Sequence, residues 1–246
     1  MMMSTFLAVF FLVPLPHSSE QHNLQGKLRA AVDKYVISEE TFPSALIKVS
    51  ERFEVPMGIE WIKSPETLRS VNLSWSHTTA NQIVESLTRQ FGYELQVKDE
   101  IINVFPRGRL RDEHDLLNLR IKSFAVRDEY VEQASRRLQA VVKRTVTPPS
   151  PSPQLGEAGS FSVSSKDRKV NFALQNATVR EILDQLSISS ALKIWIVSYP
   201  EKATKTQSGF YGTAALHVPG PLADEDQPVW VFLPWGTPLS SLRQSR

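Results

Sequence analysis

The sequence VNLSWSHTTANQIVESLTRQFGYELQV, residues 71–97, decides the fold, because it recurs as VNFALQNATVREILDQLSISSALKIWI at residues 170–196. The two stretches align without a gap at an offset of 99 residues (170 − 71 = 99). Identical pairs are Val71/Val170, Asn72/Asn171, Thr79/Thr178, Ile83/Ile182 and Leu87/Leu186. A duplicated supersecondary unit indicates a scaffold or binding protein before it indicates an enzyme.

Each copy predicts a strand followed by a helix. Apolar residues at every second position from Val71 and from Val170 predict half-buried strands. The patterns Thr79-x-x-Gln82 and Thr178-x-x-Glu181 are capping boxes, which begin helices.

The remaining elements follow from periodicity and from turn residues. Helices are predicted over 24–37, from Thr41 to Phe53 and over 129–144, and Asp128 is expected to cap the last of them. Strands are predicted over 58–62, 117–124, 193–198 and 229–233. A hairpin is predicted over 93–105. We therefore expect an α+β fold of two tandem small modules, each a short mixed sheet packed against two helices. The expected bounds are 20–107 and 112–246, with a mobile Pro/Ser/Gly-rich loop at 147–168.

Composition and the N-terminus bear on location. The chain has 246 residues, no cysteine and a net charge of +2, which is too small to indicate a nucleic acid or an anionic membrane as partner. The uncharged apolar run FLAVFFLVPL at 6–15 is too short to span a bilayer and predicts a signal peptide over residues 1–19. A disordered apolar tail and a misassigned start are the alternatives. No other segment is long and apolar enough to cross a membrane, so we expect an exported, periplasmic protein.

The first copy resembles a known domain. The residues that carry the resemblance are Val71, Asn72, Leu73, Thr79, Ile83, Leu87, Gly92, Tyr93, Leu95, Val97, Ile101, Ile102 and Val104. Their pattern resembles the short N-terminal domain shared by secretins and TonB-dependent receptors, over roughly residues 41–106. The second copy, over about 117–199, resembles the same domain or the related ring-building N-domains of secretins. The C-terminal domain of FecR-like anti-sigma regulators has a similar pattern.

The resemblance implies a periplasmic α+β module that binds protein partners and has no chemistry of its own. Only 47 residues follow Tyr199, too few for a membrane barrel with strands of about 10 residues. We therefore expect a free-standing or accessory pair of modules rather than a complete secretin or receptor.

The residues that carry chemistry in other proteins predict no catalytic, cofactor or metal site here. The five histidines are not in metal-ligand spacing, and the acidic stretch around His114 is interpreted as a solvated linker. Two Gly-x-x-Gly strings, at 156–159 and 209–212, do not join helices, so no nucleic-acid clamp is predicted.

We expect a non-enzymatic protein that recognises an envelope protein or self-assembles, by adding a partner strand to an open edge at Ile101–Phe105 or Val229–Leu233. Trp195 alternates with Ile194 and Ile196 along its strand, so its side chain is expected to face outward. Either the C-terminal strand covers this side chain or it belongs to an interaction patch. The candidate partner-binding residues are Ile101, Ile102, Val104, Trp195, Val229, Trp230 and Val231. The alternative function is a regulatory module of an anti-sigma signalling system.

Overall fold

The computed structural model describes residues 18–112, 115–146, 169–190, 192–200 and 229–233. Most of the predicted leader and the predicted loop at 147–168 therefore lie outside the described residues. Among the described helices, none combines the length and apolar character that a membrane span requires.

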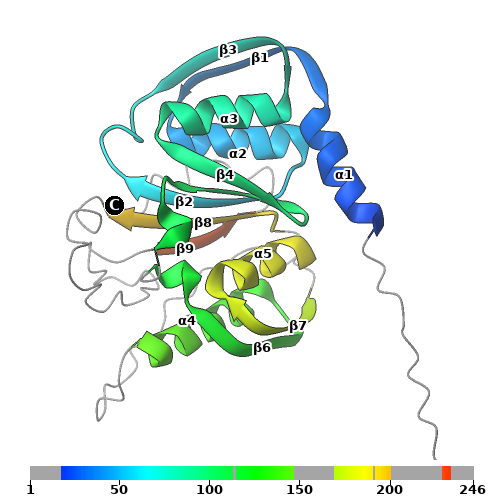
Figure 1. Ribbon diagram of the computed structural model, residues 1–246, viewed down its shortest axis with the longest axis vertical. Helices are drawn as coiled ribbons and strands as arrows, with labels where there is room; N and C mark the ends of the chain where they lie inside the picture. The colour runs from blue at the N-terminus through cyan, green and yellow to red at the C-terminus, as the bar shows by residue number, and fades with distance from the viewer. Residues whose placement is uncertain (1–17, 113–114, 147–168, 191, 201–228, 234–246) are drawn as a thin grey trace, which may run out of the picture.

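A five-stranded sheet forms the middle layer of the fold (Figure 1). Its strands, in spatial order, are β4 (Tyr93–Lys98), β5 (Ile101–Pro106), β2 (Met57–Lys63), β8 (Ile194–Pro200) and β9 (Val229–Leu233). The central strand β2 runs parallel to both β5 and β8, whereas β4–β5 and β8–β9 are antiparallel pairs.

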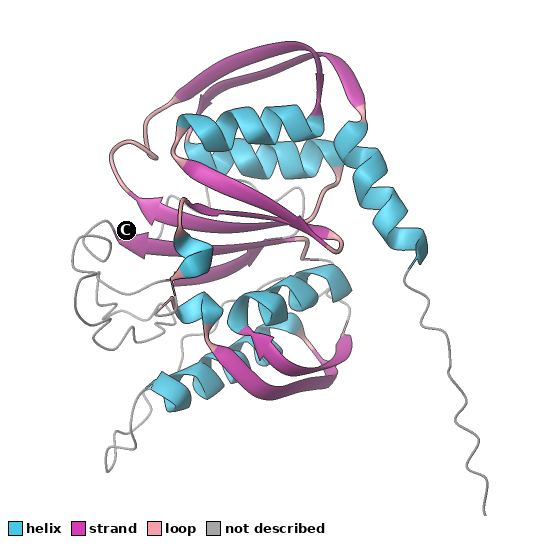
Figure 2. Ribbon diagram, in the orientation of Figure 1, coloured by secondary structure: helices cyan, strands magenta, loops and turns pink. Residues whose placement is uncertain are grey.

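Helices and a two-stranded sheet cover one face of the central sheet. Helices α2 (Phe42–Phe53) and α3 (Ala80–Gln90) pack directly on it, and β1 (Ala31–Glu40) pairs with β3 (Val71–Thr79) beyond them (Figure 2). Helix α1 (Ser18–Arg29) packs against α3 through Leu24 and Leu28. We call α1 to β5 the first half of the chain.

The second half covers the other face with the same two layers. Helices α4 (Val131–Val146) and α5 (Val179–Ser189) pack on the sheet, and β6 (Arg120–Glu129) pairs with β7 (Val170–Thr178) on their far side. Two 3-10 turns, η1 (Arg109–Arg111) and η2 (Leu116–Asn118), connect β5 to β6. The fold is thus a stack of five layers with the shared sheet at its centre.

The structure explains why an asparagine is repeated at the start of both copies. The Glu39 amide donates to Asn72 Oδ1 at 3.0 Å, and the Asp128 amide donates to Asn171 Oδ1 at 2.8 Å. Glu39 and Asp128 have φ of 56° and 53°, at a register irregularity in each antiparallel pair. The asparagine side chain therefore satisfies an amide that the irregular ladder leaves without a strand partner.

The α+β class is confirmed, and both capping boxes form as predicted. The two predicted sheets are instead one in the middle layer, because β2 of the first half pairs with β8 of the second over seven residues. This pairing satisfies backbone groups that would otherwise be exposed at the edges of two small sheets.

Two predicted boundaries are wrong. The helix expected over 24–37 ends at Arg29, and the following residues form β1, whose β-branched and aromatic side chains pair with β3. The strand expected to end at Phe124 continues to Glu129, so α4 begins at Val131 and Asp128 lies at the strand irregularity rather than capping the helix.

Candidate functional site

The predicted edge strand at 101–105 lies inside the central sheet. β5 is flanked by β4 and β2, and Ile101, Ile102 and Val104 are buried. Among the strands that the structure describes, the outer ones of this sheet are β4 and β9. Val229, Trp230 and Val231 lie in β9, opposite Ser198, Val197 and Ile196 of β8, and their side chains are outside the described set.

Trp195 is 1% exposed and packs in the core of the second half. The element that holds it is α5, because Trp195 Nε1 donates to Asp184 Oδ1 at 2.8 Å. The gapless repeat fails here: residues 91–92 separate α3 from β4, whereas residues 190–193 separate α5 from β8. The side chain of Trp195 faces the helices of its own half, as Tyr93 does in the first half.

Among the described residues, the outer edge of β4 presents backbone groups that no strand pairs with. Lys98 pairs with Ile101 across the two-residue turn, and the Arg107 amide donates to the Gly92 carbonyl at 3.3 Å. Because hydrogen-bonded pairs alternate in an antiparallel ladder, Tyr93, Leu95 and Val97 direct their N–H and C=O groups away from β5. No strand of the described part of the chain pairs with them there.

The side chains of the same three residues point into the core of the first half. Tyr93 is buried, whereas Leu95 and Val97 are only partly buried against that core. A further strand beside β4 would cover both side chains while it satisfied the open backbone groups. The open edge predicted for residues 101–105 thus lies instead on β4, the other strand of this hairpin.

A buried polar cluster joins α5 to the central sheet. We call Glu60, Asn103, Arg180, Asp184 and Trp195 the polar seam. Arg180 Nε and Nη2 donate to Glu60 Oε1 at 2.9 and 2.5 Å. Asn103 Nδ2 donates to Asp184 Oδ2 at 2.9 Å, so Asp184 accepts from strands of both halves.

Burial controls the protonation of the seam carboxyls. Desolvation raises the pKa of Glu60 to about 7, against the opposing effect of Arg180. Desolvation also raises the pKa of Asp184 to about 6, against the hydrogen bonds from Asn103 and Trp195 and the charges of Arg180 and Lys98. Arg109, Asp115 and Tyr199 extend this buried network: Arg109 pairs with Asp115, and its guanidinium lies 4.5 Å from the ring centroid of Tyr199.

The Asp184 carboxyl makes stability depend on pH. Its folded pKa of about 6 exceeds the ordinary 3.8, so its stabilising contribution is complete below pH 3.8 and is lost as pH rises through 6. Between pH 4 and pH 7 we expect this group to lower the free energy of unfolding by about 2 kcal/mol. Asp184→Asn should remove that decrease, measured as the difference between the two proteins in urea unfolding at both pH values. Equal pH dependence in the two proteins would contradict the assignment.

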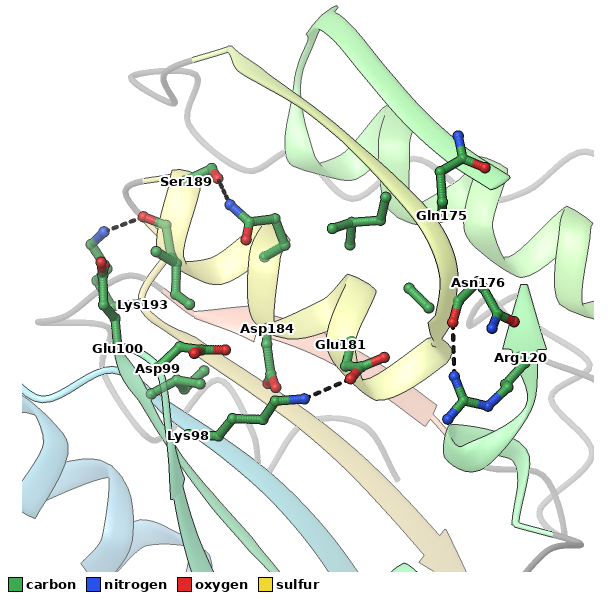
Figure 3. A pocket seen from close by; sticks show the side chains of 15 residues that line it. Lys98, Asp99, Glu100, Arg120, Gln175, Asn176, Glu181, Asp184, Ser189 and Lys193 are labelled. Carbon is green, nitrogen blue, oxygen red and sulfur yellow. Dashed lines mark hydrogen bonds and ion pairs between the residues drawn. The ribbon is translucent and has the colours of Figure 1, made fainter. Parts of the chain in front are cut away.

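A cleft of about 800 Å³ lies beside the seam, between the β4–β5 turn and the residues of α5 and β7 (Figure 3). The Lys98–Glu181 ion pair, at 2.6 Å, crosses it and links the halves. Glu181 also accepts from the Thr178 amide at 2.8 Å; burial raises its pKa, but the bonds from Lys98 and Thr178 outweigh burial and lower it.

Other polar groups of the cleft are paired within its walls. Arg120 Nη1 donates to the Asn176 carbonyl, and Lys193 Nζ donates to the Ile188 carbonyl, both at 2.8 Å. The cleft lining carries both signs of charge: Lys98, Asp99, Glu100, Arg120, Glu181, Asp184 and Lys193. The bonds of Arg120 and Lys193 lie within the second half, whereas the Lys98–Glu181 ion pair joins the two halves across the cleft.

The sequence contained a signal for the seam. Glu60 is the only charged residue in the apolar stretch MGIEWI at 57–62. Arg180 and Asp184 stand where the first copy has Asn81 and Glu85, which are half-buried and bond to each other at 2.7 Å. A charged residue inside an apolar strand indicates a buried partner of opposite charge.

Comparisons with family models, with curated proteins and with solved structures found no match to this chain. Among the described residues, no group of three or more His, Asp and Glu side chains could hold a metal ion.

Proposed function

We propose that the chain is a non-enzymatic protein-recognition module of the bacterial cell envelope, which binds its partner by strand addition along β4. The observation that carries the proposal is the open edge of β4. There Tyr93, Leu95 and Val97 present backbone donors and acceptors, and two of the three side chains are only partly buried. Strand addition joins main-chain hydrogen bonds, which give affinity, with alternate side-chain contacts, which give specificity.

The other strongly interacting groups already have structural partners. The buried charges of Glu60 and Arg180 in the polar seam, and of Arg109 and Asp115 in the network that extends it, pair with one another. The resemblance to secretin and receptor N-terminal domains and the apolar leader support an envelope location. The role is therefore recognition by a preformed edge.

Val97→Pro is expected to reduce partner capture from an envelope fraction at least about tenfold. The Val97 amide faces away from β5, so proline removes a donor from the open edge and places its ring there without removing a β4–β5 bond. One lost hydrogen bond together with the steric block is worth at least about 1.4 kcal/mol, or tenfold in affinity. Quantitative mass spectrometry of the captured proteins measures the effect.

Val97→Ala is the matched control, because it shortens the same side chain and keeps the amide. We expect it to retain most of the capture that Val97→Pro loses, with both variants unfolding cooperatively in urea. Equal capture of the same protein by all three forms would reject the β4 edge. A partner recovered from the cytoplasmic fraction instead would reject the envelope location.

A further inference from the structure

The two halves contain equivalent strands at β4 and β8. Each follows the helix that a capping box begins, and each pairs antiparallel with the next strand along the chain. Trp195, Val197 and Tyr199 of β8 face the helices of the second half, as Tyr93, Leu95 and Val97 of β4 face those of the first. The side chains of β4 and β8 are therefore oriented in the same way relative to the helices of their own half.

The edge that is open on β4 is occupied on β8. β2 runs parallel to β8 from the pair Met57–Ile194 to the pair Lys63–Pro200, and the two strands lie side by side in Figure 1. The Met57 amide donates to the Lys193 carbonyl at 3.0 Å. Because residues on a parallel strand alternate in direction, Trp195 and Val197 also offer their backbone groups to β2. On both β4 and β8, the residues whose side chains face the helices of their own half thus direct their backbone N–H and C=O groups away from the antiparallel neighbour. On β8 these groups meet β2, and on β4 they lie at the open edge.

Resting on the proposed function, we infer that the partner strand runs parallel to β4, in the way that β2 runs along β8. β2 places Met57 and Ile59 in the core of the first half and Gly58 and Glu60 on its other face. Gly58 and Glu60 are the β2 residues that lie beside Trp195 and Val197, so β2 is the template for the backbone direction at this edge and not for the side chains. Because Leu95 and Val97 are apolar and only partly buried, the partner segment is extended, with apolar residues at alternate positions that cover them. Its opposite face is polar, because β4 is polar on that side.

The residues of β4 that explain this polar face are Glu94, Gln96 and Lys98. Glu94 and Gln96 are exposed, and Lys98 is partly exposed. An apolar side chain of the partner beside Glu94, Gln96 or Lys98 would remain in water. The partner strand therefore alternates apolar and polar side chains and is not apolar throughout.

The probe is a synthetic peptide of residues 55–64, VPMGIEWIKS, which contains the β2 sequence. A nitroxide label is attached to its N-terminus in one sample and to its C-terminus in another, and the amide signals of the isotope-labelled full chain are recorded. The parallel arrangement predicts that the N-terminal label broadens the Tyr93 end of β4 and the C-terminal label the Lys98 end. A peptide of the same composition in scrambled order is the control and should broaden neither.

Hydrogen exchange provides the second readout. In the free chain the amides of Tyr93, Leu95 and Val97 should exchange at least about tenfold faster than those of Glu94 and Gln96, which bond to β5. Binding of the peptide should slow the first three and leave the other two unchanged.

The outcomes separate the two proposals. Broadening in the reverse order overturns the parallel orientation and leaves strand addition intact. Absence of peptide binding, with partner capture that still depends on Val97, overturns the β2-like partner and not the proposed function. Slow exchange of Tyr93, Leu95 and Val97 in the isolated chain overturns both, because another segment or a second copy then already occupies the edge.

Discussion

Replacing Gly58 with alanine is expected to lower the free energy of unfolding by about 3 kcal/mol, at the upper end of the usual cost of overpacking. A Cβ at this position would lie 2.3 Å from Asn103 Oδ1 and 2.3 Å from the Trp195 ring. Asn103 and Trp195 flank Gly58 on the neighbouring strands, and both donate to Asp184. Neither side chain can withdraw without breaking a buried hydrogen bond. Urea unfolding followed by circular dichroism measures the loss.

Gly26→Ala is the matched control for this prediction. A Cβ at Gly26 meets nothing within 4 Å, and the residue lies inside α1. Alanine is favoured over glycine in a helix by about 1 kcal/mol, so the same substitution should leave stability unchanged or raise it. If the two variants unfold at the same urea concentration, Trp195 is not fixed over Gly58 in the way that the structure places it.

The local elements could be predicted because their signals are local. Thr79-x-x-Gln82 and Thr178-x-x-Glu181 specify helix starts within four residues, and both form. The pairing of Met57 with Ile194 joins residues 137 positions apart (194 − 57 = 137), and no periodicity within a short window reports it. The shared sheet therefore could not be read from the pattern of either copy.

The edge at 101–105 is predicted because an apolar hairpin strand is interpreted as an open edge, and alternation assigns Trp195 an outward face although both faces of its strand are covered. The stretches IINVF at 101–105 and IWIVSY at 194–199 are nearly continuous apolar runs. Such runs are typical of strands buried on both faces, and both strands lie inside the sheet. The edge strand β4 has the mixed pattern YELQVK, in which Leu95 and Val97 alternate with polar residues. Reading continuity before parity would have favoured β4 over β5 as the edge.

Removing the guanidinium of Arg180 is expected to have the other large effect. Arg180→Met leaves Glu60, which is 1% exposed, with Arg109 as its nearest remaining cation, Nε lying 3.9 Å from Glu60 Oε2. Breaking one side of a buried ion pair costs about 3–5 kcal/mol, and we expect that loss at pH 8. At pH 5 the loss should be smaller. Burial raises the pKa of Glu60 to about 7, so its carboxyl is neutral at pH 5 and leaves no unpaired charge when Arg180 is removed.

The double variant Glu60→Gln/Arg180→Met tests whether the loss comes from an unpaired charge or from packing. With Glu60 neutralised, the buried site contains no isolated carboxylate, so the double variant should be more stable at pH 8 than Arg180→Met alone. Urea unfolding of the four proteins of this cycle at pH 5 and pH 8 gives the coupling between the two residues. Losses that simply add at both pH values would mean that α5 is held on the sheet by its apolar contacts and that the ion pair contributes nothing to it.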